Sequence, residues 1–158
     1  HVGPAHTTND VYAWIPTRGV LFTGDLVFHK VTPLALQGTI AGWLDALGEL
    51  KALGPSVVVP GHGPVGGPEA LDEVESYLRF VQDLTRAAHD QGRTALEAAQ
   101  SADLGEFAQW PDSERLVMNL HRSMSELRGE PPATPLEIGS VLGDTVAYNG
   151  GSMPHSDA

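Results

Sequence analysis

The chain has 158 residues and a formal net charge of −11, from 20 acidic and 9 basic side chains. This length suits one domain with its own hydrophobic core. The negative charge argues against nucleic acid as a partner, because the surface would repel phosphate groups. Cysteine is absent, which excludes disulfides, thiolate metal sites and a cysteine nucleophile.

No apolar run is long enough to cross a membrane, so we expect no membrane partner. The lack of cysteine is compatible with a reducing cytosol and favours a cytoplasmic location, although the sequence leaves the compartment open. The chain starts at a histidine rather than a methionine, and we expect that a preceding portion belongs to the same protein.

In chain order, two short apolar runs come first, Val11–Ile15 and Val20–Phe22. The four residues between them include proline and glycine, so the pair predicts a β-hairpin. A loop is expected after its second strand, around Gly24 and Asp25.

Apolar residues then recur at helical spacing over residues 38–53, and Gly54 with the proline after it ends the pattern. The run Val57–Val59 predicts a short buried strand that stops at Pro60. The order strand, helix, strand predicts a β-α-β element in a buried sheet.

After Gly67 the pattern becomes helical. Residues 68–88, 92–100 and 113–127 each carry apolar side chains at helical spacing and predict three helices. A Gly-rich segment follows, in which Thr145–Tyr148 fits a short strand.

Three candidate metal ligands stand at the ends of predicted strands: His6, Asp25 and His62. Imidazole nitrogen and carboxylate oxygen are ligands that zinc prefers. Each residue alone has an ordinary structural interpretation, such as a turn aspartate or an exposed histidine. Together they are more specific, because the ends of neighbouring strands converge on one edge of a sheet. Three ligands suit one catalytic zinc ion but are too few for two ions.

The three motifs, in this order and at this spacing, resemble the metallo-β-lactamase-fold hydrolases: Pro4-Ala5-His6-Thr7, Thr23-Gly24-Asp25-Leu26 and Val59-Pro60-Gly61-His62-Gly63. The resemblance covers about residues 2–64. It implies that a histidine at position 6 completes one metal site, that an aspartate at 25 bridges two metals, and that a histidine at 62 belongs to the second site. The implied cofactors are two divalent ions, zinc in first place, with iron or manganese as alternatives.

The sequence also departs from the family. The His-x-His-x-Asp-His motif that supplies the remaining ligands occurs nowhere in these residues. We therefore expect an α/β (α+β) fold that is the C-terminal half of an αββα sandwich with a helical extension. Residues 1–67 would carry the metal ligands, and residues 68–158 would complete the same domain. The expected partner is an N-terminal half of the same protein, without which this chain would be inactive; an oligomer is also compatible.

The resemblance implies a hydrolase whose metal-bridging hydroxide attacks a small ester, thioester, lactone or related substrate, with Asp25 as the catalytic residue. An aspartate at this position, and the absence of cysteine, favour the glyoxalase II-like branch over the commonest zinc β-lactamases. Two alternatives stay open. One is a mononuclear iron dioxygenase on the same fold, and the other is a metal-free binding or scaffold module.

Three further side chains are candidates for substrate binding. His29 follows Asp25 by four residues and could line the pocket. His121 and Arg122 lie together on the last predicted helix and could reach a substrate carboxylate, which arginine binds through two parallel hydrogen bonds. The ordinary alternative for each of them is a surface position.

Overall fold

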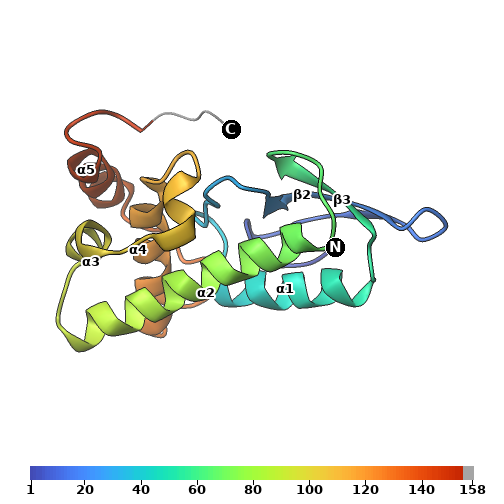
Figure 1. The fold of residues 1–158 in the computed structure, drawn as a ribbon. Helices are drawn as coiled ribbons and strands as arrows, with labels where there is room; N and C mark the ends of the chain where they lie inside the picture. Colours follow the sequence, from blue (N-terminus) through green and yellow to red (C-terminus); the bar gives the residue numbers. More distant parts are fainter. Residues whose placement is uncertain (155–158) are drawn as a thin grey trace.

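The computed structural model of the chain describes residues 1–154, and the last four residues of the predicted tail lie outside them. A small three-stranded sheet stands at one end of the molecule and helices fill the rest (Figure 1). Strand β1 (Ala13–Ile15) pairs antiparallel with β2 (Val20–Phe28), and β2 pairs in parallel with β3 (Val57–His62). The predicted hairpin and the mixed α/β class are confirmed.

Both strands that carry candidate ligands are longer than predicted. β2 continues through Gly24 and Asp25, and β3 continues through Pro60 to His62, so the predicted loop at 24–25 and the predicted strand end at 60 were wrong. The register between β2 and β3 shifts on both sides of the Gly24–Pro60 pair. Glycine and proline are tolerated there because an irregular stretch does not need every ladder hydrogen bond.

Helix α1 (Ile40–Ala52) confirms the predicted helix and crosses between the two parallel strands. Its first turn is capped by Thr39, whose hydroxyl accepts a hydrogen bond from the Gly42 amide at 2.8 Å. The helix is anchored to the sheet by Trp43, whose indole nitrogen donates to the Leu26 carbonyl at 2.9 Å. The predicted β-α-β element is therefore present as β2-α1-β3.

The second part of the chain is helical: α2 (Glu69–Asp90), α3 (Ala95–Ser101), the 3₁₀ turn η1 (Gly105–Gln109), α4 (Arg115–Leu127) and α5 (Ile138–Tyr148). The three predicted helices are confirmed. Helix α2 contacts β2 and α1 as well as α3 and α4, so it links the sheet to the helical end (Figure 1). Buried side chains from both parts of the chain belong to one hydrophobic cluster.

The strand predicted at Thr145–Tyr148 was wrong, because these residues form the end of α5. Val141 and Thr145 lie four residues apart and are the buried residues of this helix. The Thr145 hydroxyl donates to the Val141 carbonyl at 2.8 Å, which satisfies its polar atom inside the helix. The β-branched run indicated a strand, but packing of one helical face overrides so weak a local preference.

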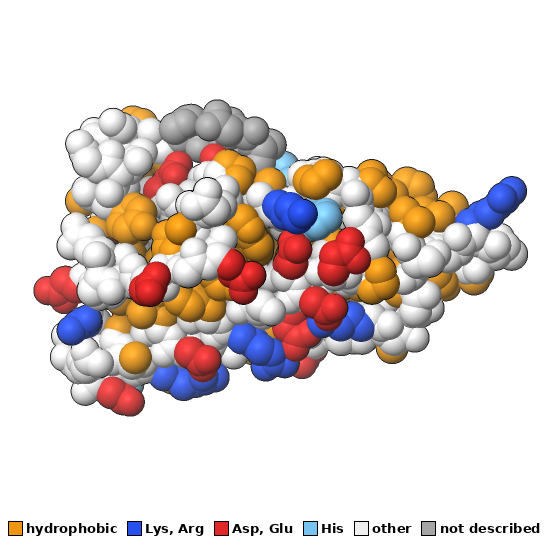
Figure 2. Space-filling model, viewed as in Figure 1, with side chains coloured by type: hydrophobic (Ala, Val, Ile, Leu, Met, Phe, Trp, Pro, Cys, Tyr) orange, Lys and Arg blue, Asp and Glu red, His pale blue; other side chains and the backbone are white. Residues whose placement is uncertain are grey.

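Acidic and basic side chains, red and blue, are scattered over the face of the molecule that Figure 2 shows. Lys51 of α1 pairs with Asp72 at 2.5 Å and also with Glu75, and Arg79 pairs with Glu75 at 2.6 Å. Exposed ion pairs of this kind contribute about 0–1 kcal/mol each, so they keep the surface solvated rather than hold the fold. Among the described residues, no helix has the length and apolar character needed to cross a membrane.

The contribution of α1 to the stability of the fold should come mainly from its packing against the sheet. Leu47 is completely buried, so Leu47→Ala should lower the free energy of unfolding by about 2–5 kcal/mol, as loss of a buried leucine usually does. Urea denaturation followed by circular dichroism measures this change. The same substitution at the exposed Leu127 is the matched control and should change stability by less than about 0.5–1 kcal/mol. Equal effects of the two substitutions would contradict this view of the core.

Candidate metal centre

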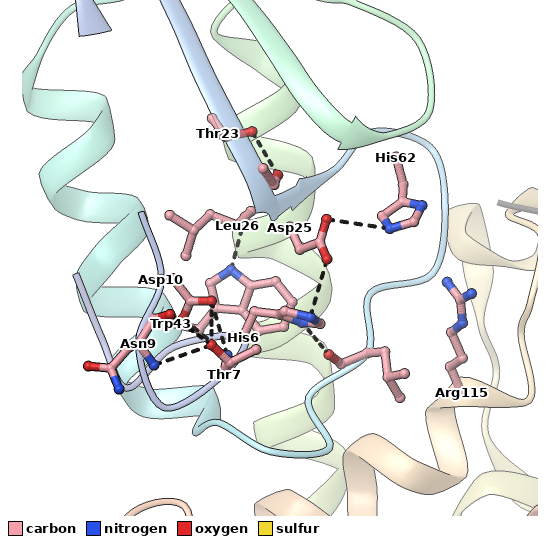
Figure 3. Close-up of polar contacts among 12 residues, drawn as sticks. His6, Thr7, Asn9, Asp10, Thr23, Asp25, Leu26, Trp43, His62 and Arg115 are labelled. Atoms are coloured by element: carbon pink, nitrogen blue, oxygen red, sulfur yellow. Dashed lines mark hydrogen bonds and ion pairs between the residues drawn. The ribbon is translucent and has the colours of Figure 1, made fainter. Parts of the chain in front are cut away.

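The three candidate ligands meet at one end of the sheet (Figure 3). Asp25, in β2, lies between the two imidazoles. Its Oδ2 atom is 3.6 Å from Nε2 of His6, and its Oδ1 atom is 3.5 Å from Nε2 of His62, the last residue of β3. The two histidines therefore face different oxygens of one carboxylate.

These two distances are longer than a hydrogen bond, which is usually about 2.7–3.2 Å. Two ligands that are each about 2.0–2.1 Å from a tetrahedral zinc ion lie about 3.3–3.4 Å apart. Each nitrogen–oxygen pair thus has nearly the separation of two ligands on one ion. Over residues 1–154, no group of three or more histidine, cysteine, aspartate or glutamate side chains is placed to hold one ion together. The three side chains thus form two nitrogen–oxygen pairs that share the Asp25 carboxylate.

The His6 ring is oriented by a backbone carbonyl. Its Nδ1 atom lies 2.7 Å from the carbonyl oxygen of Leu34. A carbonyl can only accept, so Nδ1 carries a proton, and in the neutral imidazole Nε2 then presents a lone pair towards Asp25. The rings of Phe28 and Trp43 lie 5.6 Å and 5.2 Å from the imidazole, centre to centre, and restrict its rotation.

His62 is oriented by stacking. Its ring lies 4.5 Å from the ring of Phe28, with only 14° between the two planes. Phe28 therefore contacts both imidazoles and keeps an apolar surface beneath them. The Asp25 side chain, by contrast, is 47% exposed, so the carboxylate is open to solvent and to a ligand.

A glycine at position 61 allows β3 to approach the carboxylate. A Cβ atom at Gly61 would lie 2.3 Å from Oδ1 of Asp25 and 2.7 Å from the carbonyl carbon of Gly24. No side chain fits at this distance without moving the backbone or the carboxylate. The Pro-Gly-His-Gly motif is thus explained by close approach of the two strands as well as by its histidine.

The turn around His6 is held by residues next to it. The Thr7 amide and hydroxyl both donate to the Asp10 carboxylate, at 3.0 Å and 2.8 Å. The Ala5 carbonyl accepts from the Thr39 amide at 2.9 Å, which ties the turn to the start of α1. Sequence reasoning missed the Leu34 carbonyl as the partner of His6, because a backbone carbonyl far along the chain leaves no mark in the sequence.

The three residues predicted to bind substrate have partners inside the protein. His29 is only 4% exposed, with Nδ1 2.7 Å from the Pro64 carbonyl oxygen and Nε2 3.5 Å from Glu73 of α2. His121 lies 2.8 Å from Asp144 and so links α4 to α5. These two side chains lie between elements of the fold, and their role towards a substrate stays a prediction.

Arg122 is the most deeply buried of the three, at 1% exposure. Its guanidinium donates to the backbone carbonyls of Leu36, at 2.7 Å, and Thr134, at 2.9 Å. Burial lowers the pKa of Arg122, and the acidic side chains of Glu126 and Glu130 oppose this shift. The structure thus gives this arginine a role in holding two backbone segments, and substrate binding by it also stays a prediction.

Comparison with known proteins agrees with the motifs. Residues 1–62 match the metallo-beta-lactamase superfamily. A metallo-beta-lactamase type 2 from Bacteroides fragilis is 31% identical over 92 residues, which cover 54% of this chain and 37% of the relative. The chain therefore spans well under half the length of this curated relative.

Two solved structures match parts of the chain. A metallo-beta-lactamase family protein from Thermus thermophilus matches with a TM-score of 0.58 and 21% identity, over 80% of this chain and 43% of that one. A metallo-beta-lactamase from Pontibacter korlensis is 28% identical, with a TM-score of 0.40, over 49% of this chain and 39% of that one. Over residues 1–62, which include the three motifs, this chain is thus similar to the metallo-beta-lactamase superfamily.

Proposed function

We propose that the protein is a metal-dependent hydrolase in which Asp25 bridges two divalent ions, one held with His6 and the other with His62. The position of the carboxylate carries this proposal. Its two oxygens lie 3.6 Å and 3.5 Å from the two Nε2 atoms, which is too long for hydrogen bonds and close to the spacing of two ligands on one ion. The superfamily match over residues 1–62 supports the same chemistry.

Zinc is the first choice of metal, because imidazole and carboxylate ligands suit it, and iron or manganese are alternatives. Two protein ligands per ion fall short of the three or more that catalytic sites use. We infer that further residues of the same protein, outside these 158, complete both sites. On this basis the chain alone is expected to be inactive.

Bound ions would supply a water molecule of lowered pKa and would stabilise negative charge on the substrate. The residues of this chain would hold and orient the groups that bind these ions. The Leu34 carbonyl holds His6 in the tautomer that frees Nε2, Phe28 keeps the floor of the site apolar, and Asp25 holds its two oxygens apart for two ligands.

We propose a small ester, thioester or lactone as the substrate. Aspartate rather than cysteine at position 25 is the feature that supports the glyoxalase II-like branch. The net charge of −11 disfavours polyanionic substrates such as nucleic acids, because they would be repelled from the surface.

Removing the bridging carboxylate charge should remove both ions together. In the complete protein, Asp25→Asn should lower zinc content from about two ions per molecule towards zero and hydrolysis by more than about 100-fold, because the ion sites share this ligand. Inductively coupled plasma mass spectrometry and an ester and thioester panel measure the two effects. Asp90→Asn, an exposed carboxylate at the end of α2, should leave both unchanged.

Unchanged zinc content and turnover in Asp25→Asn would refute the proposal. Iron as the bound metal, together with oxygen consumption and no hydrolysis, would instead support the dioxygenase alternative. Absence of any bound metal from the complete protein would support a binding or scaffold role.

The close approach at Gly61 gives a second test. Gly61→Ala places a Cβ atom 2.3 Å from Oδ1 of Asp25, so the carboxylate must move and zinc affinity should fall about 10-fold or more, as for other changes that misorient a ligand. Isothermal titration with zinc measures this. Gly48→Ala in α1 meets no atom within 4 Å and is the matched control. Equal zinc affinities for the two variants would contradict the assigned position of Asp25.

A further inference from the structure

One face of α4 carries four polar side chains that bond to the backbone between β2 and α1 or to the first residue of α1. Arg115, Asn119, Arg122 and Glu126 are spaced by four, three and four residues, so they lie along one side of the helix. Their bonds follow the chain in order: Arg115 to the Thr32 carbonyl (2.9 Å), Asn119 to the Pro33 carbonyl (2.8 Å) and the Ala35 amide (2.7 Å), Arg122 to the Leu36 carbonyl (2.7 Å), and Glu126 to the Ile40 amide (2.6 Å).

Asn119 holds the peptide unit on which His6 depends. The Ala35 amide, which donates to Oδ1 of Asn119, and the Leu34 carbonyl, which lies 2.7 Å from Nδ1 of His6, belong to the same peptide bond. This planar unit is thus hydrogen-bonded on one side to Asn119 and on the other to His6. Rotation of the peptide plane would break both bonds at once.

The orientation of the Asn119 amide is set by its partners. Its Nδ2 atom donates to the Pro33 carbonyl at 2.8 Å and to the Tyr77 hydroxyl at 3.1 Å, while Oδ1 accepts from Ala35. A flipped amide would place two donors, or two acceptors, against each other. Asn119 is completely buried, so water cannot replace these bonds without opening the core.

We propose that Asn119 is a positioning residue for the metal centre, acting on His6 through the Leu34–Ala35 peptide. By accepting from the amide, it fixes the plane of the peptide and strengthens the carbonyl as an acceptor, since linked hydrogen bonds polarise one another. The carbonyl in turn holds His6 with its proton on Nδ1 and its lone pair on Nε2. Partners of metal-binding histidines tune affinity in this way. This inference rests on the proposed function, because it assigns His6 to a metal.

The test reads the His6 tautomer separately from metal binding. In ¹⁵N NMR spectra of the metal-free protein with neutral imidazoles, Asn119→Ala should shift His6 towards the tautomer with its proton on Nε2. Zinc titration should then show an affinity about 10-fold weaker or more. Circular dichroism checks that the variant is folded. A purely structural role would lower stability but leave the tautomer as in the parent.

Ser125→Ala is the matched control. Ser125 is also buried on α4, but its hydroxyl donates to Glu130 at 2.6 Å rather than to the segment before α1. This variant should lose stability and keep the parental His6 tautomer and zinc affinity. A folded Asn119→Ala protein that matches the parent in both readouts would overturn the proposal.

If Asn119→Ala does not fold, Asn119→Asp is the variant that tests the positioning role. One side-chain oxygen of this variant still accepts from the Ala35 amide, while the other, at the place of Nδ2, must carry a proton to donate to the Pro33 carbonyl. His6 should therefore keep its proton on Nδ1, and a folded variant with the other tautomer would overturn the proposal. Failure of the proposed function has a different signature. A parent protein that binds no zinc, but whose His6 tautomer responds to Asn119→Ala, would refute the metal centre and support the positioning role.

Discussion

The parallel pairing of β2 with β3 brings the candidate ligands together, and the arrangement of the other elements depends on this pairing. Phe28 pairs with His62 and Gly24 pairs with Pro60, which sets Asp25 beside the end of β3. Two parallel strands cannot be joined by a tight turn, so the chain needs a long crossover. Here the crossover consists of α1 and the irregular segment before it, and that segment supplies the carbonyl that orients His6.

An irregular segment has few ladder or helix bonds of its own, so its backbone groups need other partners. Helix α4 provides them through Arg115, Asn119 and Arg122, and its Glu126 bonds to the first residue of α1. The helical part of the chain is therefore connected to the candidate metal centre by hydrogen bonds as well as by apolar packing. Burial lowers the pKa of Arg122 and raises that of Glu126.

The site combines an open carboxylate with tightly held rings. Asp25 is the exposed member, and both imidazoles contact Phe28. Such an arrangement restricts where nitrogen lone pairs can point while leaving the oxygens accessible. Each oxygen of Asp25 faces its own histidine, which is the arrangement that the proposed bridge between two ions requires.

Much of this was predictable from the sequence because it depends on local signals. The glycines around His62, the hairpin turn and the apolar spacing of α1 each report a backbone requirement within a few residues. Local signals failed where tertiary packing decides. They placed Asp25 in a loop rather than within β2, and they read the end of α5 as a strand.

The residue types of the centre, and their order, were determined by the sequence alone: two histidines and an aspartate in three short motifs. Only the tertiary structure decided which atoms face one another. The Leu34 carbonyl is 28 residues from His6, and the Ala35 amide is 84 residues from Asn119. Every residue except proline has the same amide and carbonyl. No pattern of side chains can therefore indicate which peptide unit will form hydrogen bonds with His6 and Asn119. The packing of α4 against the crossover segment determines which peptide unit lies within hydrogen-bond distance of Asn119.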